Sequence, residues 1–219
     1  MNGQRRSCSS LSRRAALQLL TVRVVTAAAA PAPLRVPVRR IMDSRAGFTP
    51  QQLHSFWWQI WPEAVRTFSG CGVELAASDA PGEIRRSPSG QLIFAGVEHG
   101  VINLVVTKQI PLGWARGRGV AGVTTLWNGH HVCVIALDHA HVNRVPLLAV
   151  NTVVHELLHA LFQDVFIVRP TWAQSEQHEL RVNWAATRLW LLHDGSGVRQ
   201  SAATYLTRLR SGSVREGGP

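Results

Sequence analysis

Residues 146–162 read PLLAVNTVVHELLHALF. Apolar residues occupy nearly every side of the helix that this segment would form, so we expect a helix buried inside the domain. His155, Glu156 and His159 place three titratable groups together in the middle of that helix. A buried cluster of this kind is costly without a partner, and a metal ion is the obvious one.

The spacing of the two histidines has a mechanical reason. Positions i and i+4 of a helix lie about 5–6 Å apart on one face, so both imidazoles can reach one tetrahedral Zn²⁺. Glu156 is expected to act as the general base, taking a proton from a metal-activated water and later giving it to the leaving amine. Chance predicts roughly 0.016 such motifs in a chain of this composition. The alternative is a hydrogen-bonded core cluster, or a relic that has lost its metal.

Upstream of this helix we expect a linker, a helix and several short strands. Residues 31–48 are rich in Pro and Arg without a clear period, which is typical of a linker. Thr49 and Pro50 form a good helix start. Pro62 is expected to kink or divide this helix, and Gly70 to end it.

The strand signals alternate with clusters of Gly, Pro and Ser, such as Ala80-Pro81-Gly82 and residues 87–90. Asn128-Gly129 is a strong signal for a two-residue hairpin turn. The expected strands are residues 72–77, 92–97, 101–107, 122–127 and 131–137.

Two further helices are expected after residue 162, over residues 172–193 and 201–209. The order of helix, mostly antiparallel strands and then helices indicates an α+β domain over residues 49–210. Residues 211–219 are expected to form a flexible tail.

The HELLH sequence at residues 155–159 resembles the active-site helix of the zincin metallopeptidases. The preceding order of a long helix, a sheet and a last edge strand is also similar to that clan. The resemblance implies a zincin-like domain with one Zn²⁺ per chain. It also implies that an extended peptide substrate pairs with the edge strand, at Val132, Val134 and Ala136.

The zincin resemblance leaves the third metal ligand to be assigned. Metzincins continue the motif with Gly and a third His, but this chain has Phe162 and Val165 there. Gluzincins use a Glu from a following helix, in the pattern Glu-x-x-x-Asp. Glu179 lies 20 residues after His159 and is followed by Asn183, which would accept a hydrogen bond from a ligand histidine. Glu176, on the same face of that helix, is the alternative ligand.

The basic residues are concentrated at the N-terminus. The chain of 219 residues carries a net charge of +10. Residues 1–45 hold nine Arg and one acid, and the remainder is nearly balanced. A basic face for nucleic acid is therefore not expected, and no nucleic-acid partner is predicted.

Residues 1–30 have the parts of an export signal: paired arginines at Arg13 and Arg14, an apolar stretch and a small-residue exit. We therefore expect a bacterial protein exported to the periplasm or beyond, although Arg23 interrupts the apolar stretch. The alternative is a disordered basic tail. No later stretch predicts a membrane-spanning helix. Cys71 and Cys133 would form one disulfide after export, or remain two buried thiols.

Together these features predict zinc-dependent hydrolysis of peptide bonds. The metal ligands would be His155, His159 and Glu179, with Glu156 as the catalytic base. Two alternatives remain, a noncatalytic binding module on a zincin scaffold and a zinc hydrolase of a non-peptide amide. Substrate specificity and oligomeric state are not indicated by the sequence.

Overall fold

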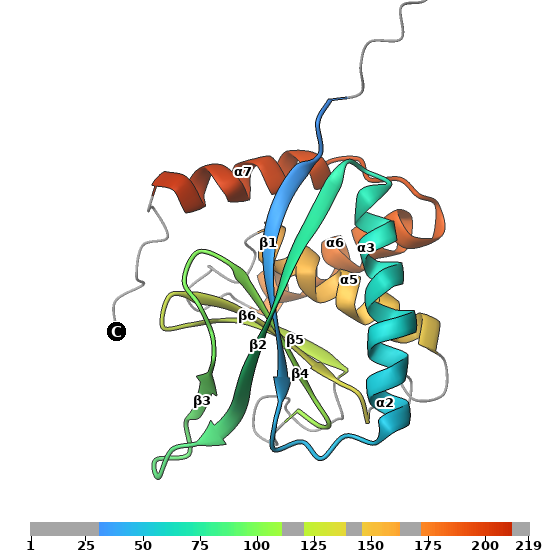
Figure 1. The fold of residues 1–219 in the computed structure, drawn as a ribbon. Coiled ribbons are helices and arrows are strands. Elements are labelled where there is room, and N and C mark those ends of the chain that lie inside the picture. The colour runs from blue at the N-terminus through green and yellow to red at the C-terminus, as the bar shows by residue number, and fades with distance from the viewer. Residues whose placement is uncertain (1–30, 111–120, 139–145, 163–171, 212–219) are drawn as a thin grey trace, which may run out of the picture. The chain divides into compact units, whose positions relative to one another are not determined.

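The computed structural model describes residues 31–110, 121–138, 146–162 and 172–211 (Figure 1). Within these residues, helices pack against a six-stranded sheet. The strands are β1 (Leu34–Asp43), β2 (Val73–Arg86), β3 (Leu92–Ala95), β4 (Ile102–Thr107), β5 (Gly122–Trp127) and β6 (His130–Ala136). The helices are α2 (Pro50–Ser55), the π-helical turn η1 (Phe56–Ile60), α3 (Trp61–Ser69), α5 (Pro146–Phe162), α6 (Trp172–Leu191) and α7 (Val198–Ser211).

The sheet has the strand order β3-β2-β1-β4-β6-β5. Its central pairings, β2 with β1, β1 with β4 and β4 with β6, are parallel, and the two outermost pairings are antiparallel. The expectation of a mostly antiparallel sheet is therefore wrong, while the α+β class is confirmed. Strands in a parallel sheet are buried on both faces, and every residue of β4 is buried, including the polar Asn103 and Thr107.

Strand β1 corrects the expected linker over residues 31–48, because it lies inside the sheet between β2 and β4. Its inward residues Val36 and Val38 are almost fully buried. Arg40 pairs with Asp79 of β2, so an arginine-rich segment can occupy a central strand. The pairing of β1 with β4 begins at Val38. Pro37 therefore lies outside this ladder, where its missing N–H is not needed. The domain therefore begins before residue 49.

Strand β2 is longer than expected, because Ala80-Pro81-Gly82 continues it instead of ending it. These residues stay paired with the end of β1. A side chain at Gly82 would meet the carbonyl oxygen of Ala95 at 2.3 Å and Ile41 at 2.4 Å. Glycine at position 82 thus allows neighbouring strands to approach closely. The sequence pattern had predicted a turn there.

The first helical segment begins and ends as expected. Thr49 forms a capping box with Gln52, and Pro50 occupies the first turn. Pro62 stands in the first turn of α3, directly after the π-helical turn η1, so the segment is divided near that residue. Gly70 caps the C-terminus of α3.

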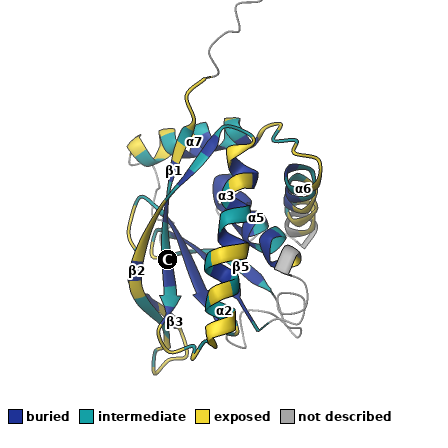
Figure 2. Ribbon diagram, turned by 45° about the vertical axis from the view of Figure 1, so that its right-hand side comes forward, coloured by how far each residue is buried: buried dark blue, intermediate teal, exposed yellow. Residues whose placement is uncertain are grey.

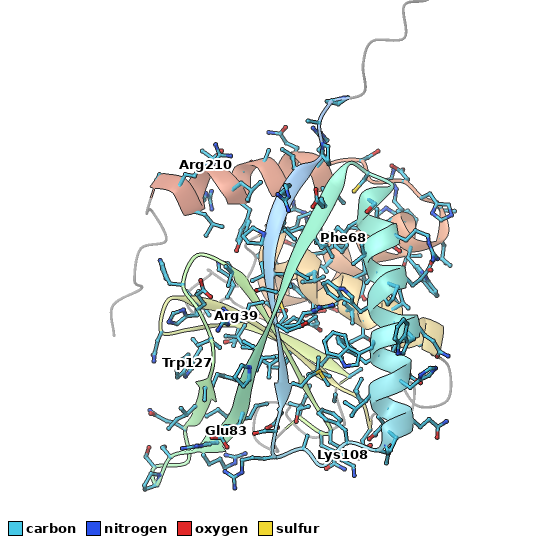
Figure 3. All side chains as sticks on the ribbon, viewed as in Figure 1. Arg39, Phe68, Glu83, Lys108, Trp127 and Arg210 are labelled. Atoms are coloured by element: carbon cyan, nitrogen blue, oxygen red, sulfur yellow. The ribbon has the colours of Figure 1, made fainter. Side chains whose placement is uncertain are left out.

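Two apolar clusters hold the fold together. The larger lies on the face of the sheet that α3, α5, α6 and α7 cover, and it contains the fully buried Phe68 of α3, labelled in Figure 3. Helix α5 is buried along most of its described length, as Figure 2 shows. A smaller cluster on the other face includes Phe94 and Val134. Both faces of the central strands are therefore protected from water.

The β5–β6 hairpin is confirmed, and it corrects the position of the edge strand. Asn128 and Gly129 have φ values of 47° and 77°, as a tight hairpin turn with two left-handed residues requires. Strand β6 pairs with β4 on one side and β5 on the other, so Val132, Val134 and Ala136 do not lie on an edge strand. Within the described residues, β5 is the edge strand on this side of the sheet, and β3 is the edge strand on the other.

Other expectations fall partly outside the described residues. Residues 1–30 and 212–219 lie outside them, so the export signal and the tail stay predictions. Cys71 and Cys133 are both free. Among the described residues, no helix combines the length and apolar character needed to cross a membrane.

Candidate metal centre

Helix α5 presents His155 and His159 side by side. Their ring centroids are 4.6 Å apart, and their Nε2 atoms are separated by 3.0 Å. The side chains are 14% and 13% exposed, which leaves them at the edge of the core but open to solvent. Buried neighbours on the same helix, among them Val154 and Leu158, fix the rotation of α5. The predicted i, i+4 arrangement is thus present.

Glu179 of α6 faces both histidines. One carboxylate oxygen lies 3.4 Å from Nε2 of His155, and the other lies 3.3 Å from Nε2 of His159. The ligand atoms of the three residues lie within 4.8 Å of one another. Helix α6 is held in place by Val182 and Ala186, which are fully buried in the larger core. We call His155, His159 and Glu179 the histidine–glutamate cluster.

The alternative ligand, Glu176, does not join this cluster. It is exposed and is absent from the group of converging ligand atoms. Asn183 is exposed, and within the described part of the chain no hydrogen bond joins it to His155 or His159. The expected hydrogen bond from a ligand histidine to Asn183 is therefore not seen among the described residues. Val165, at the position of the third metzincin histidine, lies outside the described residues.

The charges within the cluster favour an ionised carboxylate. Hydrogen bonds from His155 and His159 hold the pKa of the Glu179 carboxyl well below its usual range. Glu179 is therefore available as an anionic ligand at neutral pH. Its side chain is 57% exposed, so the cluster can be reached from solvent.

The spacing of the donor atoms fits a tetrahedral metal ion. Bonds of about 2.0–2.1 Å place neighbouring ligands roughly 3.3 Å apart around tetrahedral zinc. The nitrogen–nitrogen and nitrogen–oxygen separations in the cluster are 3.0, 3.3 and 3.4 Å. Two imidazoles and one carboxylate also form a ligand set of catalytic zinc sites, which keep a fourth position open. The residues present therefore fit the ion that the sequence predicts.

Glu156 lies beside the cluster, on the side facing the sheet. Only 4% of it is exposed, and burial raises the pKa of its carboxyl. Its Oε2 lies 2.6 Å from the hydroxyl of Thr124 on β5. Gly122, also on β5, packs against the Glu156 side chain. Sequence reasoning missed Gly122 and Thr124, because no local pattern joins them to a motif more than 30 residues away.

The described histidines outside the motif do not join the histidine–glutamate cluster. The His130 ring packs near Trp127 and His99, and the His131 ring lies edge-on to Tyr205. His139 and His141 lie outside the described residues. His130 and His131 thus pack against aromatic rings. None of their described contacts is with the histidine–glutamate cluster.

Comparison with known proteins adds no relative. No protein-family model, no curated protein and no solved structure matches this chain.

Proposed function

We propose that this protein is a zinc-dependent metallopeptidase of the zincin type. The observation that carries the proposal is the convergence of His155, His159 and Glu179, from two helices, at separations that suit one tetrahedral zinc ion. Glu156 adjoins this cluster as the catalytic base. Bound zinc supplies a Lewis acid that polarises a carbonyl and lowers the pKa of water to about 7.

Glu156 moves the proton in the proposed reaction. Its carboxylate takes a proton from the attacking water and passes it to the leaving amine. Glu156 directly follows His155 on α5 and lies one turn before His159, and this placement supports a base close to the proposed metal ligands. A buried carboxylate beside the ligands is costly, and this role gives a reason for it.

Strand β5 supports an extended peptide as substrate. It is the edge strand next to α5, and within the described residues only β6 pairs with it, so its outer backbone groups can pair with another strand. Its Thr124 contacts Glu156, which places the edge beside the proposed base. We therefore assign the substrate-pairing role to β5, in place of Val132, Val134 and Ala136 on β6.

The decisive experiment compares zinc content and peptide cleavage. Protein comprising residues 31–219, prepared without chelator, is expected to contain about one equivalent of zinc and to cleave members of a peptide library. Glu156→Gln should keep the zinc and lose turnover by about a thousandfold or more, because the carboxylate transfers protons and does not bind the metal. Glu176→Gln, on α6 outside the cluster, is the matched control and should leave both unchanged.

The alternatives give different outcomes in the same assay. A noncatalytic binding module would hold zinc and retain peptides uncleaved, with Glu156→Gln having no effect. A hydrolase of non-peptide amides would cleave acylated amines and leave the peptides intact. Absence of zinc and of every other transition metal would contradict the proposal as a whole.

We also propose that the N-terminus directs export. The support is the order of paired arginines, apolar stretch and small residues over residues 12–31. Expressed in a bacterium, the full chain should be cut near Ala30 and recovered outside the cytoplasm. Arg13→Lys with Arg14→Lys should block this if the twin-arginine route is used. Recovery of intact N-termini in the cytoplasm alone would contradict export.

A further inference from the structure

We infer that the edge strand β5 positions the catalytic base, with Thr124 holding the Glu156 carboxylate by a hydrogen bond and Gly122 leaving the space in which it lies. The inference rests on the proposed function, because it assigns a role to residues that act through Glu156. Thr124 and Gly122 are positioning residues in this account. Neither belongs to the HELLH motif or to the histidine–glutamate cluster.

The first observation is the pair of short distances from the Thr124 hydroxyl. Its oxygen lies 2.6 Å from Oε2 of Glu156 and 3.0 Å from the main-chain carbonyl oxygen of the same residue. A distance near 2.6 Å is typical of a hydroxyl that donates to a carboxylate. One strand residue thus contacts both the side chain and the backbone of Glu156, which restricts where the carboxylate can point.

The second observation is that the described residues offer Glu156 no substitute for Thr124. Among the described residues, the Thr124 hydroxyl provides the only hydrogen bond to the Glu156 carboxylate. Glu156 is 4% exposed, so water does not readily replace this partner. Loss of the hydroxyl would leave a buried carboxylate free to turn toward the metal ligands, where it would lose its place as a base.

The third observation is steric. A Cβ atom at Gly122 would lie 2.6 Å from Oε1, 2.7 Å from Cγ and 2.9 Å from Cδ of Glu156. Real Cβ atoms essentially never approach other atoms so closely, so any other residue would displace the Glu156 side chain. The backbone of Gly122 is not left-handed. Glycine is needed there for space and not for conformation.

Both residues lie on the side of β5 that faces α5. Thr124 pairs in register with Cys133 and Gly122 with Ile135, and these β6 residues belong to the core beneath α5. The Thr124 side chain is directed at Glu156, and the outer edge of β5 offers backbone groups. Loss of the hydroxyl should therefore change the chemical step more than substrate binding.

The experiment uses Thr124→Val, which keeps the shape and removes the hydroxyl, and Thr124→Ser, which restores it. We expect Thr124→Val to lower kcat by about 10- to 100-fold, the effect of losing a hydrogen bond to a charged group. KM should stay within about twofold and zinc content at one equivalent. Thr124→Ser should recover kcat to within about threefold of the wild type.

Two further variants complete the set. Gly122→Ala should lower kcat to a similar extent although the hydroxyl is intact, and it keeps the test valid if Thr124→Val does not fold. Thr152→Val on α5 is the matched control, because among the described residues that hydroxyl bonds only to the carbonyl of Leu148 in its own helix. The control should keep the wild-type kcat.

A second readout does not depend on activity. In protein labelled with ¹³C at the glutamate δ-carbon, the Glu156 resonance is identified by its loss in Glu156→Gln. Thr124→Val and Gly122→Ala should each shift this resonance, and Thr124→Ser should return it toward its original position. Thr152→Val should leave it in place.

The outcomes separate the two proposals. If the wild type cleaves no peptide and Glu156→Gln behaves like it, the proposed function fails, and the Glu156 resonance alone then decides whether Thr124 places the carboxylate. If the wild type is active and Glu156→Gln is not, an unchanged kcat in Thr124→Val overturns the role of Thr124. Whether or not the protein cleaves peptides, a Glu156 resonance that does not move in Thr124→Val overturns the positioning role of Thr124.

Discussion

His155 and His159 on α5 differ from His130 and His131 on β6 mainly in their neighbours. The α5 pair faces the carboxylate of Glu179, from a second helix, and is partly open to solvent. The β6 pair is surrounded by rings: His130 lies near Trp127, and His131 packs edge-on against Tyr205. Neighbouring histidines are therefore not enough for a candidate zinc site, which also needs a third ligand atom that converges with theirs.

The largest expected effect is the loss of zinc affinity when the carboxylate of the histidine–glutamate cluster is removed. Glu179→Ala should weaken zinc binding by several hundredfold or more, corresponding to the roughly 3–4 kcal/mol that each ligand contributes to a zinc site. Glu176→Ala, three residues earlier on α6, should bind zinc like the wild type. Competition with a zinc indicator dye measures both affinities. Loss of the metal in Glu176→Ala and not in Glu179→Ala would overturn the ligand assignment.

The next largest effect concerns the pH dependence of stability at His131. Burial, reinforced by nearby His99, lowers the pKa of His131 from 6.5 to about 4. Between pH 4 and pH 6.5, His131 therefore binds a proton more readily in the unfolded state than in the folded state. The stabilising contribution is complete above pH 6.5 and is lost as the pH falls toward 4, by at most about 3 kcal/mol.

Urea unfolding of zinc-free protein at pH 7 and pH 4.5 measures this contribution. His131→Leu should reduce the loss of unfolding free energy between the two pH values by about 2–3 kcal/mol. His54→Gln changes an exposed histidine on α2 and should leave that loss unchanged. An equal loss in the wild type and His131→Leu would show that His131 is not held neutral by burial.

The smallest effect is expected at Tyr205, the aromatic partner of His131. Its hydroxyl is buried and has no hydrogen-bond partner among the described residues. Tyr205→Phe keeps the edge-on ring contact and removes the unsatisfied group, so the free energy of unfolding should stay equal or rise by up to about 1 kcal/mol. Tyr205→Leu, which also removes the ring, should destabilise the protein. A loss above about 1 kcal/mol in Tyr205→Phe would reveal a partner for the hydroxyl.

Local patterns in the chain predicted the parts of the fold that depend on near neighbours. The Thr49 cap, the helix end at Gly70 and the Asn128-Gly129 turn each involve contacts across a few residues. The histidine pair on α5 is of the same kind, since the helical repeat alone brings residues four apart together. Such features depend only on residues a few positions apart in the sequence, so they can be predicted from a short segment.

The errors concern long-range pairing. Strand β1 was hidden because its arginines and Pro37 resemble a linker, and its acidic partners Glu74, Asp79 and Glu98 lie more than 30 residues away. The choice between β5 and β6 as the edge strand had the same cause. An apolar run shows that a strand is buried, but not which strands lie on either side of it.

The sequence by itself determined the helix that carries the candidate site, two histidines on one face of it and a glutamate between them, because helical geometry is local. It also favoured Glu179 over Glu176 as the third ligand. Only the tertiary structure decided that Glu179 meets both histidines and that Gly122 and Thr124 lie against Glu156. Those contacts depend on how α6 and β5 pack against α5, and packing between elements is set by the whole core.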